Sequence, residues 1–150
     1  MSIPFRLEIP RRLYEALVAQ ARTELPNECC GLLAGTIDSQ GVKPGQPAVG
    51  RVVERYPLVN ATASPTRYES EPRSMFEAIR DMRRRGIDVL AVYHSHPTTA
   101  PVPSRTDLQR NYSPDVMNLI VSLQNGEARM AAWWLAEHDY RAAEWVMGGG

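Results

Sequence analysis

Apolar and polar residues alternate at the start of the chain and then change to a helical spacing. Between Ile3 and Ile9 every second residue is apolar, which predicts a half-buried strand. Apolar residues then recur four positions apart from Leu13 to Ala21, which predicts a helix that Pro10 can start. We therefore expect a strand followed by a helix at the beginning of the chain.

The next two apolar segments are separated by a stretch rich in glycine and proline. Gly31–Ile37 and Arg51–Asn60 predict strands, and Ser39–Gly50 between them predicts a flexible connection. That connection could form a flap that faces a substrate, although a plain solvent loop is the simpler interpretation. An ordered loop is expected at Asn60–Tyr68.

A second helix is marked at both ends. Glu71-Pro72 opens it, and Gly86 stops it after three arginines, which suit the negative end of the helix dipole. The arginines could contact an acidic partner, but charge complementarity at the helix end explains them more simply. The predicted apolar stripe consists of Met75, Phe76, Ile79 and Met82.

The second half of the chain is dominated by strand patterns. Ile87–Tyr93 and Val116–Leu123 are apolar runs that predict buried strands, and Asn125-Gly126 is a hairpin signal. Arg129–Ala136 and Tyr140–Met147 predict two more strands, paired around a turn. A short helix is expected at Arg105–Tyr112. The order predicts a single α+β domain of the α/β/α type, with helices flanking a mixed, mostly antiparallel sheet.

Composition excludes several classes of function. The chain has 150 residues, of which 43% are hydrophobic, and this suits one soluble domain with a single sizeable core. Basic and acidic residues number 17 each, so no general electrostatic partner such as duplex nucleic acid is favoured. No apolar run approaches a membrane span, and the N-terminus has no signal-peptide core, which indicates a cytoplasmic protein. The adjacent Cys29 and Cys30 are expected as free thiols, and the three tryptophans as packing residues.

Two histidines and an aspartate follow the run at Ile87–Tyr93. His94 and His96 are separated by one residue, so on a strand both imidazoles point to the same face. Imidazole is the commonest protein ligand of zinc, and a catalytic zinc takes three protein ligands plus water. Asp107 is a plausible third ligand, since prolines stiffen the loop that leads to it. Ser95 faces away and is expected to have a structural role only.

Ser104 and Asp107 also fit a helix start. A serine with a carboxylate three residues later is typical of an N-cap. The two interpretations are compatible, because a helix start is a rigid place to mount a ligand. Cys29 is a disfavoured ligand, since the other three fill the set, and His138 is expected in a turn and not at the metal.

The complete segment resembles a known motif. The segment His94-Ser95-His96-Pro97, followed by Ser104-x-x-Asp107, is similar to the JAMM motif of the MPN-type zinc metalloproteases. In that motif, a glutamate stands far upstream of H-x-H-P and S-x-x-D. Upstream, Pro26–Gly35 resembles the P-E-E-x-C-G-L-L-x-G segment of small prokaryotic members and places Glu28 at the glutamate position, with Asn27 departing from the usual acidic residue. Without the resemblance, Glu28 would be interpreted as a solvated carboxylate between a helix and a strand.

The resemblance implies a fold and a mechanism. The fold is the JAMM/MPN domain, which is cytidine-deaminase-like. One zinc per chain would be held by His94, His96 and Asp107, with Glu28 as general base and then acid. Ser104 would donate a hydrogen bond to the oxyanion.

The resemblance also implies a class of substrate. Family members cleave amide or isopeptide bonds after the Gly-Gly tail of a ubiquitin-like or sulfur-carrier protein. The sulfur-carrier interpretation comes first, because the chain lacks the insertions of polyubiquitin-specific relatives. The pattern identifies no substrate-binding residue, and the chain could form a homodimer. We expect a domain over residues 1–147 and a flexible tail at Gly148–Gly150. Alternatively, this tail could imitate a diglycine substrate and enter a neighbouring molecule.

Three other functions stay open. One is a RadC-like protein, a branch associated with DNA repair, which shares the P-x-P-S pattern at Pro101–Ser104. The segment around Glu28 and the balanced charge argue against it. Some MPN domains are non-catalytic scaffolds, but every ligand position is present here. A peptidase for other small peptides, as in phage-tail or cell-wall contexts, is the third alternative.

Overall fold

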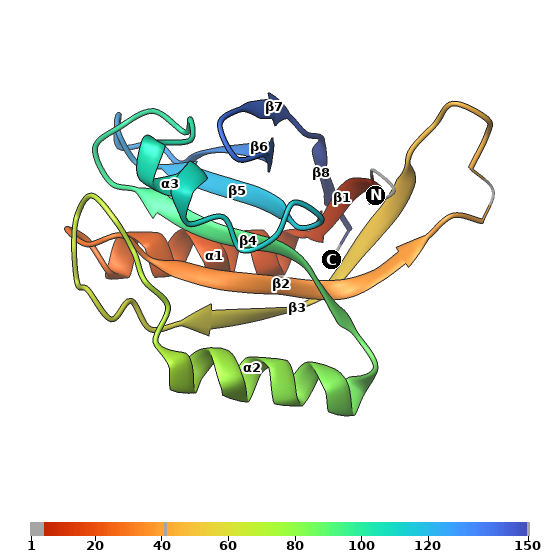
Figure 1. Ribbon diagram of the computed structural model, residues 1–150, viewed down its shortest axis with the longest axis horizontal. Coiled ribbons are helices and arrows are strands. Elements are labelled where there is room, and N and C mark those ends of the chain that lie inside the picture. The colour runs from red at the N-terminus through yellow and green to blue at the C-terminus, as the bar shows by residue number, and fades with distance from the viewer. Residues whose placement is uncertain (1–4, 41, 150) are drawn as a thin grey trace.

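The computed structural model describes residues 5–40 and 42–149, which form an eight-stranded sheet in the order β7-β6-β5-β4-β2-β3-β1-β8 (Figure 1). Four strand pairings are antiparallel and three are parallel, which confirms the mixed, mostly antiparallel sheet. The strands are β1 (Phe5–Pro10), β2 (Cys30–Asp38), β3 (Ala48–Leu58), β4 (Asp88–His96), β5 (Met117–Ser122), β6 (Arg129–Leu135), β7 (Tyr140–Ala142) and β8 (Trp145–Gly148).

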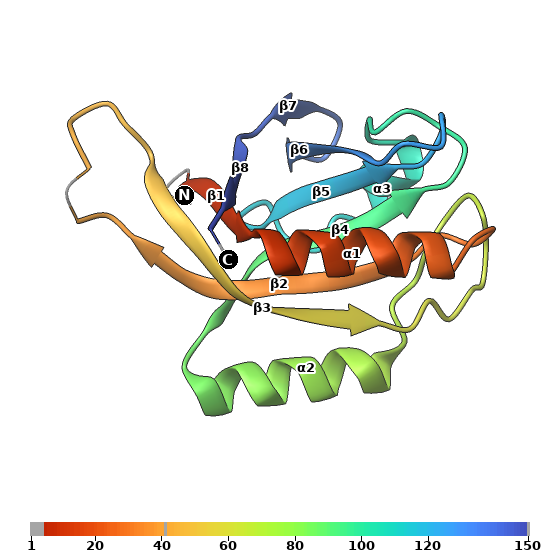
Figure 2. The same ribbon diagram turned by 180° about the vertical axis from the view of Figure 1, so that it is seen from behind.

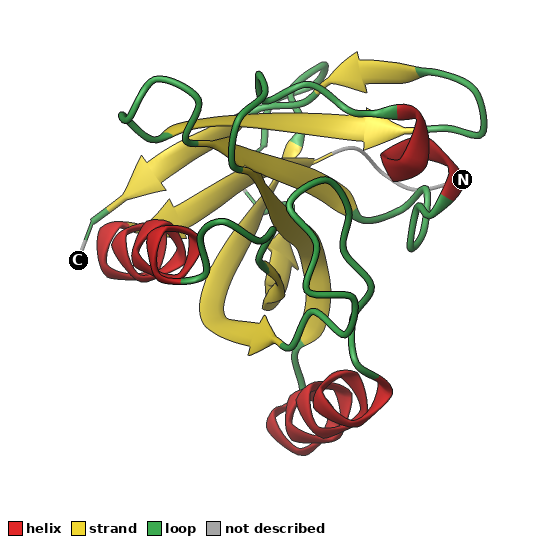
Figure 3. Ribbon diagram, turned by 90° about the vertical axis from the view of Figure 1, so that its left-hand side faces the viewer, coloured by secondary structure: helices red, strands yellow, loops and turns green. Residues whose placement is uncertain are grey.

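Two long helices cover opposite faces of the curled sheet. Helix α1 (Arg11–Thr23) lies behind the sheet in Figure 1 and in front of it in Figure 2, whereas α2 (Pro72–Arg85) packs below β3. The end view in Figure 3 shows the sheet curling between them. The larger hydrophobic core lies between α1 and the sheet, and the smaller one lies between α2 and the sheet. The predicted α/β/α arrangement is therefore confirmed.

The first two elements form as their patterns predict. Phe5, Leu7 and Ile9 are buried on one side of β1, because alternate side chains of a strand share a face. Pro10 is the N-cap of α1, whose buried residues are Leu13, Leu17 and Ala21. The predicted first position of the strand, Ile3, lies outside the described residues.

Strand β3 differs from the prediction in its bounds. It begins at Ala48, inside the predicted connection, and ends at Leu58. The reason is pairing on two sides, since Ala48 pairs with Phe5 of β1 and the next residue pairs with Asp38 of β2. Hydrogen bonding to two neighbours extends the strand beyond its own apolar pattern.

The prediction of a single strand over Tyr140–Met147 is wrong. Only β7 pairs with β6, and the chain then crosses to the other edge of the sheet, where β8 runs parallel to β1. The Leu7 N–H donates to the carbonyl of Glu144 at 3.0 Å, and the Trp145 ring stacks on Tyr14 of α1. β8 thereby covers an edge of β1 that would otherwise present unpaired backbone groups.

The helix predictions need two smaller corrections. α3 (Arg105–Gln109) ends before the predicted Tyr112. On α2, Ala78 and Met82 are buried, whereas Phe76 of the predicted stripe is 64% exposed. The caps are as expected: the Glu71 side chain accepts from Ser74 N, and Gly86 has φ 69°. No helix of the described residues is long and apolar enough to cross a membrane.

Candidate metal centre

The two histidines lie at the end of β4, in the middle of the sheet. His94 pairs with Cys30 of β2 and with Ile120 of β5, so neighbours on both sides hold the backbone. Both imidazoles are buried and point to the same face, as their spacing predicts. Ser95 points to the other face, where its hydroxyl accepts the Cys29 N–H at 2.8 Å. Ser95 thus joins β4 to the residue that follows Glu28.

The loop after β4 is fixed by three hydrogen bonds to its carbonyl groups. Ser122 donates to Thr99 at 2.6 Å, and the Trp133 indole N–H donates to Pro101 at 2.9 Å. His96 Nδ1 lies 2.8 Å from the carbonyl oxygen of Ala100. A carbonyl can only accept, so Nδ1 carries the hydrogen, and in the neutral ring Nε2 is left with a free lone pair.

The loop delivers Asp107 to the histidines on the first turn of α3. Ser104 caps this helix by accepting the Asp107 N–H at 3.1 Å, and the Asp107 carboxylate accepts the Ser104 N–H at 2.8 Å. The predicted cap is therefore confirmed as a reciprocal capping box. One carboxylate oxygen remains directed at each histidine.

The three side chains converge on one point. Asp107 Oδ1 lies 3.1 Å from His94 Nε2, Oδ2 lies 3.2 Å from His96 Nε2, and the two Nε2 atoms are 3.2 Å apart. Donor atoms around a tetrahedral zinc lie about 3.3 Å apart, given zinc–nitrogen bonds of about 2.0–2.1 Å. All three residues are buried, so the group fits a divalent metal in both spacing and chemistry.

At Asp107 and His94, electrostatics favour the protonation states that bind a metal. Burial alone would raise the pKa of Asp107, but the polar contacts with His94 and His96 and the hydrogen bond from the Ser104 N–H outweigh it and hold the pKa well below its usual value. Burial lowers the pKa of His94, which keeps this ring neutral. An ionised carboxylate and a neutral imidazole are the forms that ligate zinc.

Glu28 lies beside this group and is not the solvated carboxylate of the alternative interpretation. It is 3% exposed and lies two residues before Cys30, the first residue of β2. Because Cys30 pairs with His94 in an antiparallel register, Glu28 is directed towards His96. Burial raises its pKa to about 8, His96 opposes that rise and Asp107 adds to it. Among the described residues, Glu28 Oε1 has no hydrogen-bond partner. A buried carboxylate oxygen left free beside three metal-binding groups is suited to a polar reactant.

Two residues of the centre were not predicted from the sequence. The Tyr68 ring stacks on His94 with centroids 4.7 Å apart. Asn60 connects the loop that carries Tyr68 to Glu28, because its amide donates to the Glu28 carbonyl at 2.9 Å. The only sequence signal was the ordered loop expected at Asn60–Tyr68. His138 is exposed and remote from the group, as expected of a turn residue.

The fold and the histidine–aspartate group define a JAMM-type domain, and comparison with known families agrees. The family model described as prokaryotic homologs of the JAB domain matches residues 10–136, which is most of the chain. The protein therefore belongs to this family.

Individual relatives extend the similarity. The chain is 34% identical over 119 residues to a protein named CysO-cysteine peptidase from Mycobacterium tuberculosis, covering 79% of this chain and 75% of the relative. It is 31% identical over 141 residues to a desampylase from Haloferax volcanii, covering 91% and 92%. A solved structure of a Desulfitobacterium hafniense protein has a TM-score of 0.82 and 30% identity, covering 96% of this chain and 94% of that one.

Proposed function

We propose that this protein is a zinc-dependent metallopeptidase that hydrolyses the amide or isopeptide bond after the Gly-Gly tail of a ubiquitin-like or sulfur-carrier protein. The observation that carries the proposal is the buried His94–His96–Asp107 group with Glu28 beside it. The names of the relatives support the reaction class, since they include a peptidase and a desampylase. The sulfur-carrier class takes precedence because of the CysO-cysteine peptidase.

In the proposed reaction each side chain has a distinct role. His94, His96 and Asp107 would hold one zinc, which when bound supplies Lewis acidity and a water of lowered pKa. Glu28 accepts a proton from the attacking water and later donates it to the leaving amine, as a base and then an acid. Its burial and its free Oε1 support that role.

The two roles predicted for Ser104, helix cap and oxyanion donor, are compatible. Its oxygen accepts the Asp107 N–H in the capping box, and its own hydroxyl hydrogen is not used in that bond. The hydroxyl can therefore donate to the oxyanion that forms on the attacked carbonyl. The cap fixes the oxygen and so aims this donor.

The state of the two cysteines supports the proposal of a cytoplasmic enzyme. Cys29 and Cys30 are free and buried, which fits a reducing compartment. We propose the cytoplasm as the site of action and retain the homodimer as an open alternative.

Metal analysis is the first test of the proposal. Elemental analysis of purified wild type should give about one zinc per chain, and His96→Ala should lose it, because one of three ligands is removed. No metal in either protein, even after refolding with zinc, would leave an MPN-like scaffold as the function.

Cleavage is the second test. Wild type should release the group attached after Gly-Gly in a carrier conjugate. Mass spectrometry measures this release. Glu28→Gln should bind zinc but cleave at least ~100-fold more slowly, because an amide cannot accept the proton. Stoichiometric zinc with no cleavage of any conjugate would contradict the proposed activity.

A further inference from the structure

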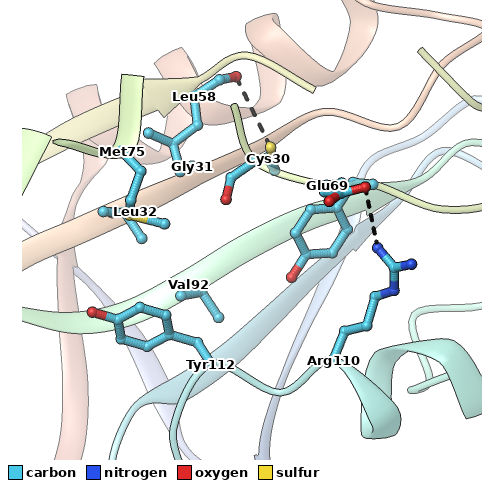
Figure 4. Close-up of a pocket in the computed structure, with 11 residues that line it drawn as sticks. Cys30, Gly31, Leu32, Leu58, Glu69, Met75, Val92, Arg110 and Tyr112 are labelled. Atoms are coloured by element: carbon cyan, nitrogen blue, oxygen red, sulfur yellow. Dashed lines mark hydrogen bonds and ion pairs between the residues drawn. The ribbon is translucent and has the colours of Figure 1, made fainter. Parts of the chain in front are cut away.

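A small cavity lies in the face of the sheet that α2 covers (Figure 4). Cys30, Leu32 and Val92 line it from β2 and β4, and Leu58 and Met75 line it from β3 and α2. Its volume is about 280 Å³, below the ~300–1,000 Å³ of typical ligand pockets. The size therefore suits a single side chain better than a cofactor.

The cavity lies next to the metal centre. Val92 precedes His94 by two residues on the same face of β4, and the paired residues of β2 are Leu32 and Cys30. Two residues of a strand span about 6.6–6.8 Å. Tyr68 contacts both places, since it lines the cavity and stacks on His94. The cavity thus begins two residues along the strand from the first ligand.

The lining determines which side chains can enter. The contributions from β2, β3, β4 and α2 are apolar, and charge appears only in the Glu69 and Arg110 side chains, which pair with each other at 3.6 Å (Figure 4). Their charges offset one another, so neither attracts an isolated charge strongly. A charged substrate side chain would lose its hydration among apolar groups without gaining a partner. An uncharged aliphatic side chain is therefore the best occupant.

We propose that this cavity is a specificity pocket for an aliphatic side chain at the third residue before the cleaved bond. The proposal rests on the proposed function, in which two glycines precede that bond. In an extended substrate tail whose last residue lies at the metal centre, the third-from-last residue lies about 6.6–6.8 Å from that last residue. These two residues face the same side of the tail. This distance matches the separation of His94 and Val92. Counted back from the cleaved bond, the third residue is also the first with a side chain, because the two residues nearest the bond are glycines.

Quenched fluorescent peptides of the form X-Gly-Gly-Lys test the proposal. With X as Leu, Ala or Lys, wild type should prefer Leu, and kcat/KM should be about tenfold lower for Ala and lower still for Lys. Met75→Trp should fill the cavity and remove the preference. Met75→Ala should enlarge the cavity and shift the preference towards a fourth peptide with X as Phe. The matched control is Phe76→Ala on the same helix, because Phe76 is 64% exposed and does not line the cavity.

The outcomes separate this inference from the proposed function. Equal kcat/KM for all three peptides, or a preference that depends only on residues after the bond, would overturn the pocket while leaving the peptidase intact. If no peptide is cleaved, fluorescence polarisation with labelled X-Gly-Gly peptides decides. Tighter binding of Leu than Ala in wild type but not in Met75→Trp would support the pocket, and equal binding would overturn it. If the larger residue prevents folding, Met75→Ala is used instead, and a shift of its preference from Leu towards Phe is then the supporting result, whereas an unchanged preference overturns the pocket.

Discussion

Glu28 and His94 each bury a polar atom that has no hydrogen-bond partner among the described residues. Such atoms cost free energy in a folded protein, and here both belong to the candidate metal centre. For Glu28 Oε1, a reactant in the site could supply the missing partner. The unpaired oxygen of Glu28 should lower the free energy of unfolding, as expected of a residue kept for proton transfer. This loss can be measured.

Replacing Glu28 by Gln should stabilise the metal-free protein. The folded-state pKa of about 8 exceeds the ordinary value of 4.5. The stability contributed by the protonated form is therefore fully present below pH 4.5 and is lost as pH rises from there through about 8. Glu28→Gln should therefore raise the free energy of unfolding by about 1–3 kcal/mol above pH 8 and by less at pH 5. Urea denaturation with chelator at both pH values measures this. The control is Glu15→Gln on the exposed side of α1, and an equal response of the two variants would contradict the account.

Asn60 is predicted to position Glu28 through the backbone. Its amide donates to the carbonyls of Glu28 and Arg67, and its oxygen accepts N–H groups of Thr62 and Glu69. Asn60→Ala should lower stability by about 1–3 kcal/mol, because four backbone groups lose a partner, among them the carbonyl of the buried Glu28. It should also lower kcat more than it raises KM while zinc content stays unchanged, since the metal ligands are not touched.

The matched control for Asn60 is Thr62→Val, which removes one hydroxyl bond to the same oxygen. Its effect on kcat should be clearly smaller. If Asn60→Ala lost zinc in proportion to its loss of kcat, the result would instead indicate general unfolding of the centre.

At the scale of elements, the N-terminus of α3 carries a helix cap and a proposed oxyanion donor, and the two should differ in the size of their effects. Ser104→Ala removes the cap, which should destabilise the protein by about 1 kcal/mol. It also removes the proposed oxyanion donor, which should lower kcat by about 10²–10³. Ser104→Thr keeps both groups and should retain most activity and stability. Thermal melts and steady-state kinetics separate the effects, and a kcat loss below about tenfold in Ser104→Ala would reduce Ser104 to a cap.

The sequence predicts those elements whose determinants are local. The capping box at Ser104 and Asp107 and the i, i+2 histidines of β4 follow from neighbouring residues. The start of β3 and the crossing to β8 could not be predicted, because each depends on pairing with β1, which is distant in the chain. Tyr68 and Asn60 were missed for the same reason, since their contacts to His94 and Glu28 are tertiary.

At the scale of the molecule, the sheet separates two cores, and the candidate metal centre lies on the face that carries the smaller core. β2 and β4 contribute to both cores, with Leu33 and Tyr93 on the α1 side and Leu32 and Val92 on the α2 side. Glu28, His94 and His96 therefore extend from the most constrained part of the sheet. Pairing on both sides explains how the side chains of the candidate site can be held in place before a metal binds. It also makes the geometry of the site depend on strands far from it.

The C-terminal strand offers a test of that dependence. β8 pairs with β1 along residues 145–148, and the Trp145 indole donates to the Met130 carbonyl at 3.2 Å. Deleting residues 145–150 should lower the free energy of unfolding by about 3–5 kcal/mol, as loss of a packed tryptophan does, and should expose the edge of β1 to self-association. Zinc content should persist in the fraction that stays folded, because none of the three ligands is removed. Urea unfolding and light scattering measure these effects.

Deleting only Gly149 and Gly150 is the matched control and also tests the tail hypothesis. Gly148 already belongs to β8, where it pairs with Pro10, so the shorter deletion leaves the strand complete. Stability should change by less than about 0.5 kcal/mol, with activity and mass in solution unaltered. A change in activity or association would instead support a tail that enters a neighbouring molecule's site. Equal stability of the two deletions would show that β8 does not hold the edge of the sheet, contrary to the packing of Trp145 on Tyr14.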